Sequence, residues 1–206
     1  MKLWIIPFSN RYKYISSFEE GVSKGLPKKK SHIYRFTRGY LRFCLSRIFS
    51  LPCEDIPIFS LPGKPPTLPN KYGYVSMSHT NNTLLIGWSI KNIGVDIENI
   101  NRNINVERIL KSKWFKNDQE RIKCLNDNDV KKEILKIWVI KEALVKSHFG
   151  SIIRDYDYWL IKNEFIAENY KLKIFRKISH KVINNWTIGI AYDESILFNS
   201  EIIEFL

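Results

Sequence analysis

The chain has 206 residues, a length that suits one domain of ordinary size or two small fused ones. Hydrophobic residues make up 44% and charged residues 26%, a globular balance that excludes a disordered or collagen-like chain. Lysine and arginine number 33 against 21 aspartates and glutamates, so the net charge is +12. A field of this sign favours polyanionic partners such as nucleic acid, phosphorylated cofactors or acidic proteins, although a composition rich in Lys, Ile and Asn also explains the excess.

The sequence also indicates where the protein resides. No apolar run approaches the ~20 residues that a membrane-spanning helix needs, and the apolar stretch near Met1 is too short for a signal peptide. Three cysteines, Cys44, Cys53 and Cys124, are an odd number without metal-like spacing. We therefore expect a soluble protein of the reducing cytoplasm, with no membrane partner.

The first clear element is an amphipathic helix before residue 50. Apolar residues recur at helical spacing, namely Ile33, Phe36, Tyr40, Cys44 and Ile48. A second stripe of the same helix carries Arg35, Arg38 and Arg42, three and four residues apart. This stripe is either a solvated basic face or a surface that binds an anion.

Residues 61–70 hold four of the eight prolines and predict a connection, because proline removes the donors that helices and central strands need. Strands are expected at 72–77 and at 83–90, the second almost wholly apolar as in a strand buried on both faces. A third strand follows at 93–98. Asn81–Gly87 weakly resembles Asn184–Gly189, a match that either reflects an internal duplication or arises by chance.

Helices dominate the next part of the chain, and strands the last part. Helical patterns cover about 106–125 and 130–148, separated by the polar residues 126–129. Strands are expected at 156–161, 171–178 and 182–192.

The strand at 93–98 carries two acids on one face. Side chains alternate along a strand, so Asp96 and Glu98 lie opposite Ile93, Val95 and Ile97, roughly 6.6 Å apart. Two carboxylates so close repel each other in a cleft unless a cation such as Mg²⁺ lies between them. The alternative is a strand whose outer face is simply wet.

In the helix at 130–148, Trp138, Glu142 and Lys146 follow one another at intervals of four and therefore share one stripe. Glu142 and Lys146 form either an ordinary surface pair or a functional pair. In the functional case Glu142 is a third metal ligand or a base, and Lys146 donates to phosphate.

The order of these motifs resembles the 4′-phosphopantetheinyl transferases. Gly94-Val95-Asp96-Ile97-Glu98, about forty residues, and Trp138-Val139-Ile140-Lys141-Glu142-Ala143 with Lys146 resemble that family's paired signature. Gly63-Lys64-Pro65, the Ser76–Thr80 segment and the arginine-rich helix around Arg38 resemble features of its larger, Sfp-type branch. The resemblance runs from about residue 31 to residue 150.

The resemblance implies an α+β fold of two similar α/β halves related by a pseudo-twofold, which we place at residues 1–92 and 93–206. It implies Mg²⁺-dependent (or Mn²⁺-dependent) transfer of the phosphopantetheine arm of coenzyme A to a serine of an acidic acyl or peptidyl carrier protein. Adenosine 3′,5′-bisphosphate is released, and the family analogy suggests a monomer.

Roles are carried over by position. Asp96, Glu98 and Glu142 would hold the metal, and Glu142 would also take the serine proton. Lys146 would stabilise charge on the transferring phosphate, with Lys141 nearby. The remaining coenzyme A contacts would come from the first half, namely Arg38 (or Arg42), Lys64, Ser78 and His79.

One segment departs from the family pattern, and two other functions compete. The family follows its lysine with K-x-x-G-x-G-L, whereas this chain reads Lys146-Ser147-His148-Phe149-Gly150-Ser151-Ile152, so the contacts of this loop cannot be transferred. A metal-dependent nuclease would also need clustered acids and a lysine, and a basic nucleic-acid-binding module would explain the charge. The module leaves the acids unexplained, and many nucleases place their second acid and lysine two apart on one strand.

Overall fold

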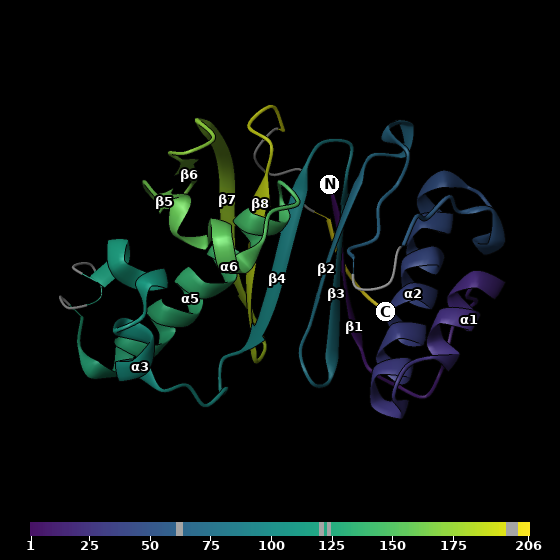
Figure 1. Cartoon of the computed structure of the whole chain (residues 1–206), viewed down its shortest axis with the longest axis horizontal. Helices are drawn as coiled ribbons and strands as arrows, with labels where there is room; N and C mark the ends of the chain where they lie inside the picture. The colour runs from purple at the N-terminus through teal and green to yellow at the C-terminus, as the bar shows by residue number, and fades with distance from the viewer. Residues whose placement is uncertain (61–63, 120–121, 123–124, 197–201) are drawn as a thin grey trace.

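The computed structural model describes the whole chain apart from residues 61–63, 120–121, 123–124 and 197–201. Gly63 and Cys124 therefore lie outside the described residues. The described strands form two sheets, with helices on the outer face of each (Figure 1). A mixed α and β fold is thereby confirmed. None of the helices in the described part of the chain is both long and apolar enough to cross a membrane.

The first sheet has the strand order β2-β3-β1-β9. Its members are β1 (Lys2–Pro7), β2 (Tyr74–His79), β3 (Thr83–Ser89) and β9 (Ile202–Phe205). β3 is antiparallel to both neighbours, whereas β9 runs parallel to β1. β3 is buried along almost its whole length, as its apolar sequence predicts.

The second sheet has the order β4-β8-β7-β6-β5, and all its pairs are antiparallel. Its members are β4 (Ile93–Asn99), β5 (Trp159–Ile161), β6 (Ile166–Asn169), β7 (Ile174–Ile183) and β8 (Trp186–Tyr192). β2 and β4 lie side by side where the two sheets meet (Figure 1). At this seam Val95 N–H donates to Ser76 Oγ at 3.0 Å, so a side chain of β2 satisfies a backbone amide of β4.

Two long helices carry the outer layers. α2 (Lys28–Phe49) covers the first sheet and α5 (Asp127–Lys146) covers the second, while α1 (Ser17–Lys24) packs against α2 (Figure 1). The shorter helices are α3 (Val106–Leu110), α6 (Ile152–Asp155) and the 3₁₀ turns η1 (Cys53–Asp55), η2 (Asn70–Tyr72), η3 (Lys113–Asp118) and η4 (Tyr156–Tyr158). α1 begins with a capping box between Ser16 and Glu19, which satisfies its first amides.

Alternation along the strands produces three apolar layers. Trp4 and Ile6 of β1 pack toward α2, while Leu3 and Ile5 pack toward the second sheet. The other face of the second sheet packs against α5 through a third cluster that includes Trp159. The order is therefore helix, sheet, sheet, helix, with β3 and most of β4 buried on both faces.

The arginine stripe of α2 is not a uniformly solvated face. Arg38 and Arg42 are only 6% and 4% exposed. Arg42 Nε lies 2.7 Å from Glu19 Oε2, and its guanidinium also donates to the carbonyls of Cys53 and Ile56. Arg42 thus links α2 to α1 and to the segment that follows α2. Arg38 makes none of these contacts, and its Nε has no hydrogen-bond partner in the structure.

When strands β5, β6 and β9 and the helices other than α2 and α5 are set aside, one order of elements occurs twice along the chain. β1, α2, β2 and β3 form one set, and β4, α5, β7 and β8 form the other. In both sets the last strand pairs with the first strand on one side and with the third element on the other, which gives the orders β2-β3-β1 and β7-β8-β4. The two segments with similar sequences, 81–87 and 184–189, lie at the start of β3 and of β8.

Several elements differ from the sequence-based expectations. Strands β1, β6 and β9 and helix α1 were not predicted, and the helical region at 106–125 is interrupted between α3 and η3. β9, which lies in the segment 93–206, joins the first sheet as the parallel neighbour of β1. α2, β3, β4 and α5 agree with their predicted positions.

Candidate active site

A glycine brings the acidic strand against the helix that faces it. A Cβ on Gly94 would lie 1.8 Å from the carbonyl oxygen of Ala143, so only glycine permits β4 and α5 to approach so closely. Gly189 on neighbouring β8 has the same relation to Val139. Because of this contact, Asp96, two residues after Gly94, lies beside Glu142 and Lys146 on α5.

Asp96 is the centre of the cluster. It is 2% exposed, and its Oδ1 accepts hydrogen bonds from Lys146 Nζ and from Ser78 Oγ, each at 2.6 Å. Its second oxygen, Oδ2, is buried and has no hydrogen-bond partner in the structure. A buried carboxylate oxygen without a partner is costly unless a ligand satisfies it.

Glu142 and Lys146 complete a charged triad with Asp96. Lys146 Nζ lies 3.6 Å from Glu142 Oε2. Burial, together with the nearby charge of Asp96, raises the pKa of Glu142 to about 7. Burial alone would lower the pKa of Lys146, but the charges of Asp96 and Glu142 more than offset it and raise that pKa. The site therefore places the charged ammonium of Lys146 next to the carboxyl group of Glu142, which titrates near neutral pH.

Glu98 lies at the edge of this group and turns toward Arg102, with which it forms an ion pair. Burial raises its pKa, the Arg102 charge lowers it, and the Asp96 charge raises it again. Arg102 also lies over the ring of Trp138, 5.5 Å from its centroid. As the side chains stand, no group of three His, Cys, Asp or Glu side chains among the described residues is arranged to ligate one metal ion.

The acids nevertheless suit a divalent cation chemically. The charge of Asp96 contributes to the raised pKa of both Glu98 and Glu142, and Asp96 Oδ2 lacks a hydrogen-bond partner in the structure. Lys146 at present supplies the positive charge between Asp96 and Glu142. Three carboxylates are an oxygen donor set that Mg²⁺ or Mn²⁺ accepts.

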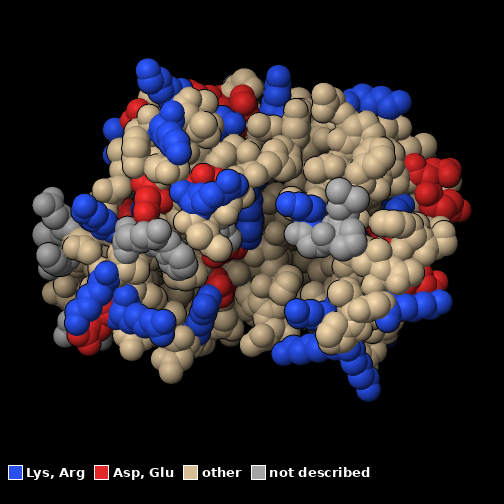
Figure 2. All heavy atoms as spheres, viewed as in Figure 1, with Lys and Arg blue, Asp and Glu red and all other residues tan. Residues whose placement is uncertain are grey.

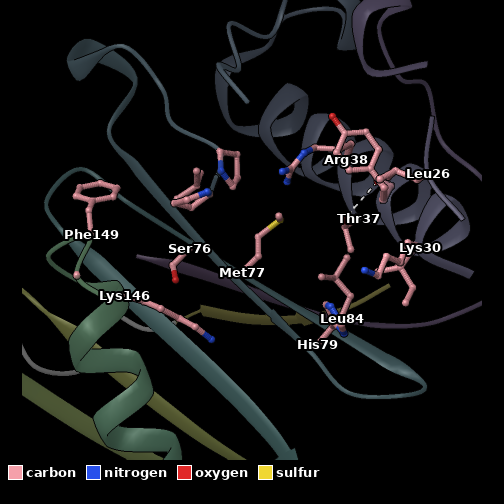
Figure 3. Close-up of a pocket in the computed structure, with 16 residues that line it drawn as sticks. Leu26, Lys30, Thr37, Arg38, Ser76, Met77, His79, Leu84, Lys146 and Phe149 are labelled. Carbon is pink, nitrogen blue, oxygen red and sulfur yellow. Dashed lines mark hydrogen bonds between the residues drawn. The ribbon is translucent and has the colours of Figure 1, made fainter. Parts of the chain in front are cut away.

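A cavity of about 600 Å³, here called the main cavity, opens beside the triad between α2, β2 and the end of α5. Lys146 reaches it from α5 and Arg38 from α2, with Phe149 at one end and His79 and Lys30 at the other (Figure 3). The molecule is hollowed on this face, and Lys and Arg side chains lie on both sides of the hollow (Figure 2).

Arg38 is poised for a ligand of the main cavity. Its Nε is buried without a hydrogen-bond partner in the structure, and its guanidinium carbon lies 5.1 Å from the centroid of the Tyr34 ring. Burial lowers the pKa of Arg38, and its interaction with Tyr34 offsets only part of that effect. An anionic or hydrogen-bond-accepting ligand would satisfy the guanidinium.

His79 connects the main cavity to a second cavity of about 780 Å³, which also contains Glu98 and Arg102. The exposed ring of His79 lies 6.2 Å from that of Phe8, edge to face. Lys146 of the triad thus lines the main cavity, which is mainly apolar, whereas Glu98 lines the second cavity together with several asparagines.

Two predicted residues are not brought to this group. Lys141 is fully buried, pairs with Asp118 at 2.6 Å and lies over the Tyr156 ring, so its ammonium is used inside the protein. Lys64 is exposed and is not among the residues that line the main cavity. Ser78 reaches Asp96 directly and thus stands closer to the acids than expected.

Sequence reasoning missed Lys30, Arg102 and Phe149. Lys30, Tyr34 and Arg38 are four residues apart and line the same cavity, so the helical spacing contained a signal for Lys30. Arg102 follows Glu98 by four residues but lies beyond the strand. Nothing in the sequence around Phe149 indicated its position.

Comparison with known families supports a functional site where β4 of the second sheet faces α5. Residues 92–191 match the model of the 4′-phosphopantetheinyl transferase superfamily. The matched region contains Asp96, Glu98, Glu142 and Lys146, and it ends within β8. No curated protein matches the chain. The match supports a transferase, and the residues before 92 lie outside it.

Proposed function

We propose that this protein transfers the 4′-phosphopantetheine group of coenzyme A to a serine of an apo acyl or peptidyl carrier protein and releases adenosine 3′,5′-bisphosphate. The convergence of Asp96, Glu142 and Lys146 beside the main cavity carries the proposal, since all three lie in the matched region. Residue identity alone did not require that convergence. The repeated order of elements supports the Sfp-type, pseudo-twofold architecture as part of the same proposal.

Asp96, Glu98 and Glu142 would hold Mg²⁺ or Mn²⁺. When bound, such an ion neutralises charge on the diphosphate, which is the main requirement of phosphoryl transfer. The carboxylates must first exchange their present partners, because Asp96 contacts Lys146 and Glu98 contacts Arg102. Lys146 is then free to move toward a phosphate oxygen of the substrate.

Glu142 would take the proton of the attacking serine. The serine hydroxyl must lose its proton as it attacks, and a carboxylate within hydrogen-bond reach can accept it. Lys146 would donate to an oxygen of the transferring phosphate and stabilise its negative charge. The two residues come from adjacent turns of one rigid helix, so their separation is fixed by the backbone.

Coenzyme A would bind in the main cavity. Arg38, Lys30 and His79 line this cavity. Their side chains would donate hydrogen bonds to the phosphates or to other polar groups of the nucleotide. Lys64 and Ser78 remain candidate contacts of coenzyme A, as the resemblance to the family implies. Ser78 would also orient Asp96. Lys141 would support the site indirectly, through its buried pair with Asp118.

The decisive experiment measures the carrier directly. Purified protein is incubated with Mg²⁺, coenzyme A and a panel of apo carrier proteins, and each carrier is weighed by mass spectrometry. We expect a phosphopantetheine adduct on at least one carrier. Asp96→Asn should abolish the adduct with unchanged circular dichroism, whereas Asp129→Asn, on an exposed turn of α5, should not. Nuclease activity without any adduct would overturn the proposal.

A further inference from the structure

The end of α5 places an aromatic residue in a backbone conformation that normally belongs to glycine. Gly150 N–H donates to Val145 C=O at 3.0 Å and Phe149 N–H to Lys146 C=O at 3.2 Å, which is the hydrogen-bond pattern of a Schellman motif. In this motif the residue after the cap is left-handed, and Phe149 has φ of 56°. Glycine is the usual choice there, since a side chain makes this conformation unfavourable.

Packing of the Phe149 ring does little to compensate for this unfavourable backbone conformation. It is 51% exposed, and its one ring contact that the structure records is with Tyr74, at a centroid separation of 6.4 Å. The ring lies at one end of the main cavity, three residues after Lys146 (Figure 3). Unfavourable backbone conformations persist where surrounding structure or function requires them.

A similar left-handed end of α2 shows what the position needs for folding alone. Ser50 N–H and Leu51 N–H both donate to Ser46 C=O, and Ser50, with φ of 54°, is the left-handed residue. Ser50 is exposed and lines neither cavity described above. A small polar residue therefore suffices where the helix end faces only solvent.

We propose that Phe149 is a ligand-contacting residue whose ring packs against an uncharged part of the coenzyme A molecule in the main cavity. The inference rests on the proposed function. Two parts of coenzyme A offer the required apolar surface, namely the flat adenine base and the branched hydrocarbon of the pantetheine arm. The other walls of this cavity favour such a group, because Pro65, Pro66, Val75 and Met77 also line it.

The test compares Phe149→Gly with Ser50→Gly. Both variants place glycine at a left-handed helix end, so both should keep or raise the melting temperature, by up to about 4 °C. Only Phe149→Gly should raise the Kd of coenzyme A measured by calorimetry, about tenfold for the loss of one aromatic contact. Phe149→Tyr should restore wild-type affinity, because it keeps the ring.

Two fragments identify the part of the ligand that meets the ring. If Phe149→Gly weakens adenosine 3′,5′-bisphosphate but not 4′-phosphopantetheine, the ring contacts the base, and the reverse result assigns it to the arm. Equal affinity of wild type and Phe149→Gly for coenzyme A and both fragments overturns the inference and leaves the proposed function intact. A melting temperature that falls in Phe149→Gly, with unchanged affinity, also overturns it and makes the ring a packing residue. Absence of coenzyme A binding by the wild type overturns the proposed function, and this inference with it.

Discussion

The hydroxyl of Ser78 fixes the carboxylate at the centre of the site. It donates to Asp96 Oδ1, the same oxygen that meets Lys146, and so leaves Oδ2 as the oxygen without a partner. A hydrogen bond to a buried carboxylate holds its orientation as well as its charge.

Ser78→Ala should therefore weaken the binding of Mn²⁺ about tenfold, as measured by paramagnetic resonance in the presence of coenzyme A. Ser76→Ala is the matched control on the same strand. Its hydroxyl accepts from Val95 N–H and does not contact Asp96, so this change should lower stability by about 1–3 kcal/mol and leave the affinity for Mn²⁺ intact. Equal Mn²⁺ affinities in wild type and Ser78→Ala would remove Ser78 from this role.

His180 on β7 makes stability depend on pH. Burial, with a smaller contribution from Lys136, lowers its pKa to about 4, and its Nε2 lies 2.8 Å from Thr187 Oγ1. The unfolded chain, with an ordinary histidine pKa near 6.5, binds the proton more readily than the folded protein does. The contribution of His180 is thus fully present above about pH 6.5 and is lost as the pH falls from there toward 4.

His180→Gln should reduce this acid sensitivity. The urea midpoint of the wild type should drop more between pH 7.5 and pH 5 than that of the variant, because glutamine carries no titrating proton. Parallel losses in both proteins would show that other groups cause the acid dependence.

At the scale of elements, the contact between β4 and α5 decides whether a site exists. Gly94→Ala inserts a methyl group 1.8 Å from Ala143 O, so strand and helix must separate. We expect a loss of about 3 kcal/mol or more in the free energy of unfolding, with activity reduced further because Asp96 moves away from Glu142.

Gly21→Ala supplies the control for Gly94→Ala. No atom lies within 4 Å of a Cβ at Gly21, which is exposed on α1, and the substitution should raise stability by about 0.5–1 kcal/mol. Urea denaturation measures both changes. A Gly94→Ala protein as stable as the wild type would contradict the close approach of β4 and α5.

The elements that sequence patterns predicted are those with strong periodicity of their own. α2 and α5 repeat apolar residues at helical spacing, and β3 is apolar throughout. The missed strands β6 and β9 have four residues each and are defined by hydrogen bonds to partners elsewhere, in the case of β9 to the opposite end of the chain. Such pairing leaves no local pattern to detect.

The candidate site, too, could be predicted only where the residues lie in a regular element or a known motif. Spacing placed Glu142 and Lys146 on one stripe, and the motif order brought Asp96 to them. Neighbouring helical residues point in different directions, so Lys141 lies on the buried side, where Asp118 meets it. The sequence does not reveal this, because Asp118 comes from the irregular segment η3.

At the scale of the whole molecule, the net charge of +12 should speed encounter with an acidic carrier. Raising the salt concentration from about 50 to about 500 mM should increase the KM for the carrier several-fold, because salt screens long-range attraction. The kcat at saturating carrier should change little. A KM that stays constant across this series would show that docking does not depend on charge.

β9 has a consequence for the order of events during biosynthesis. It supplies the neighbour of β1 on the side away from β3, yet it is translated about two hundred residues later. Until residues 202–205 have been made and released, that edge of β1 must stay uncovered, so β1 lacks one of its two neighbours while nearly all the residues between them are synthesised.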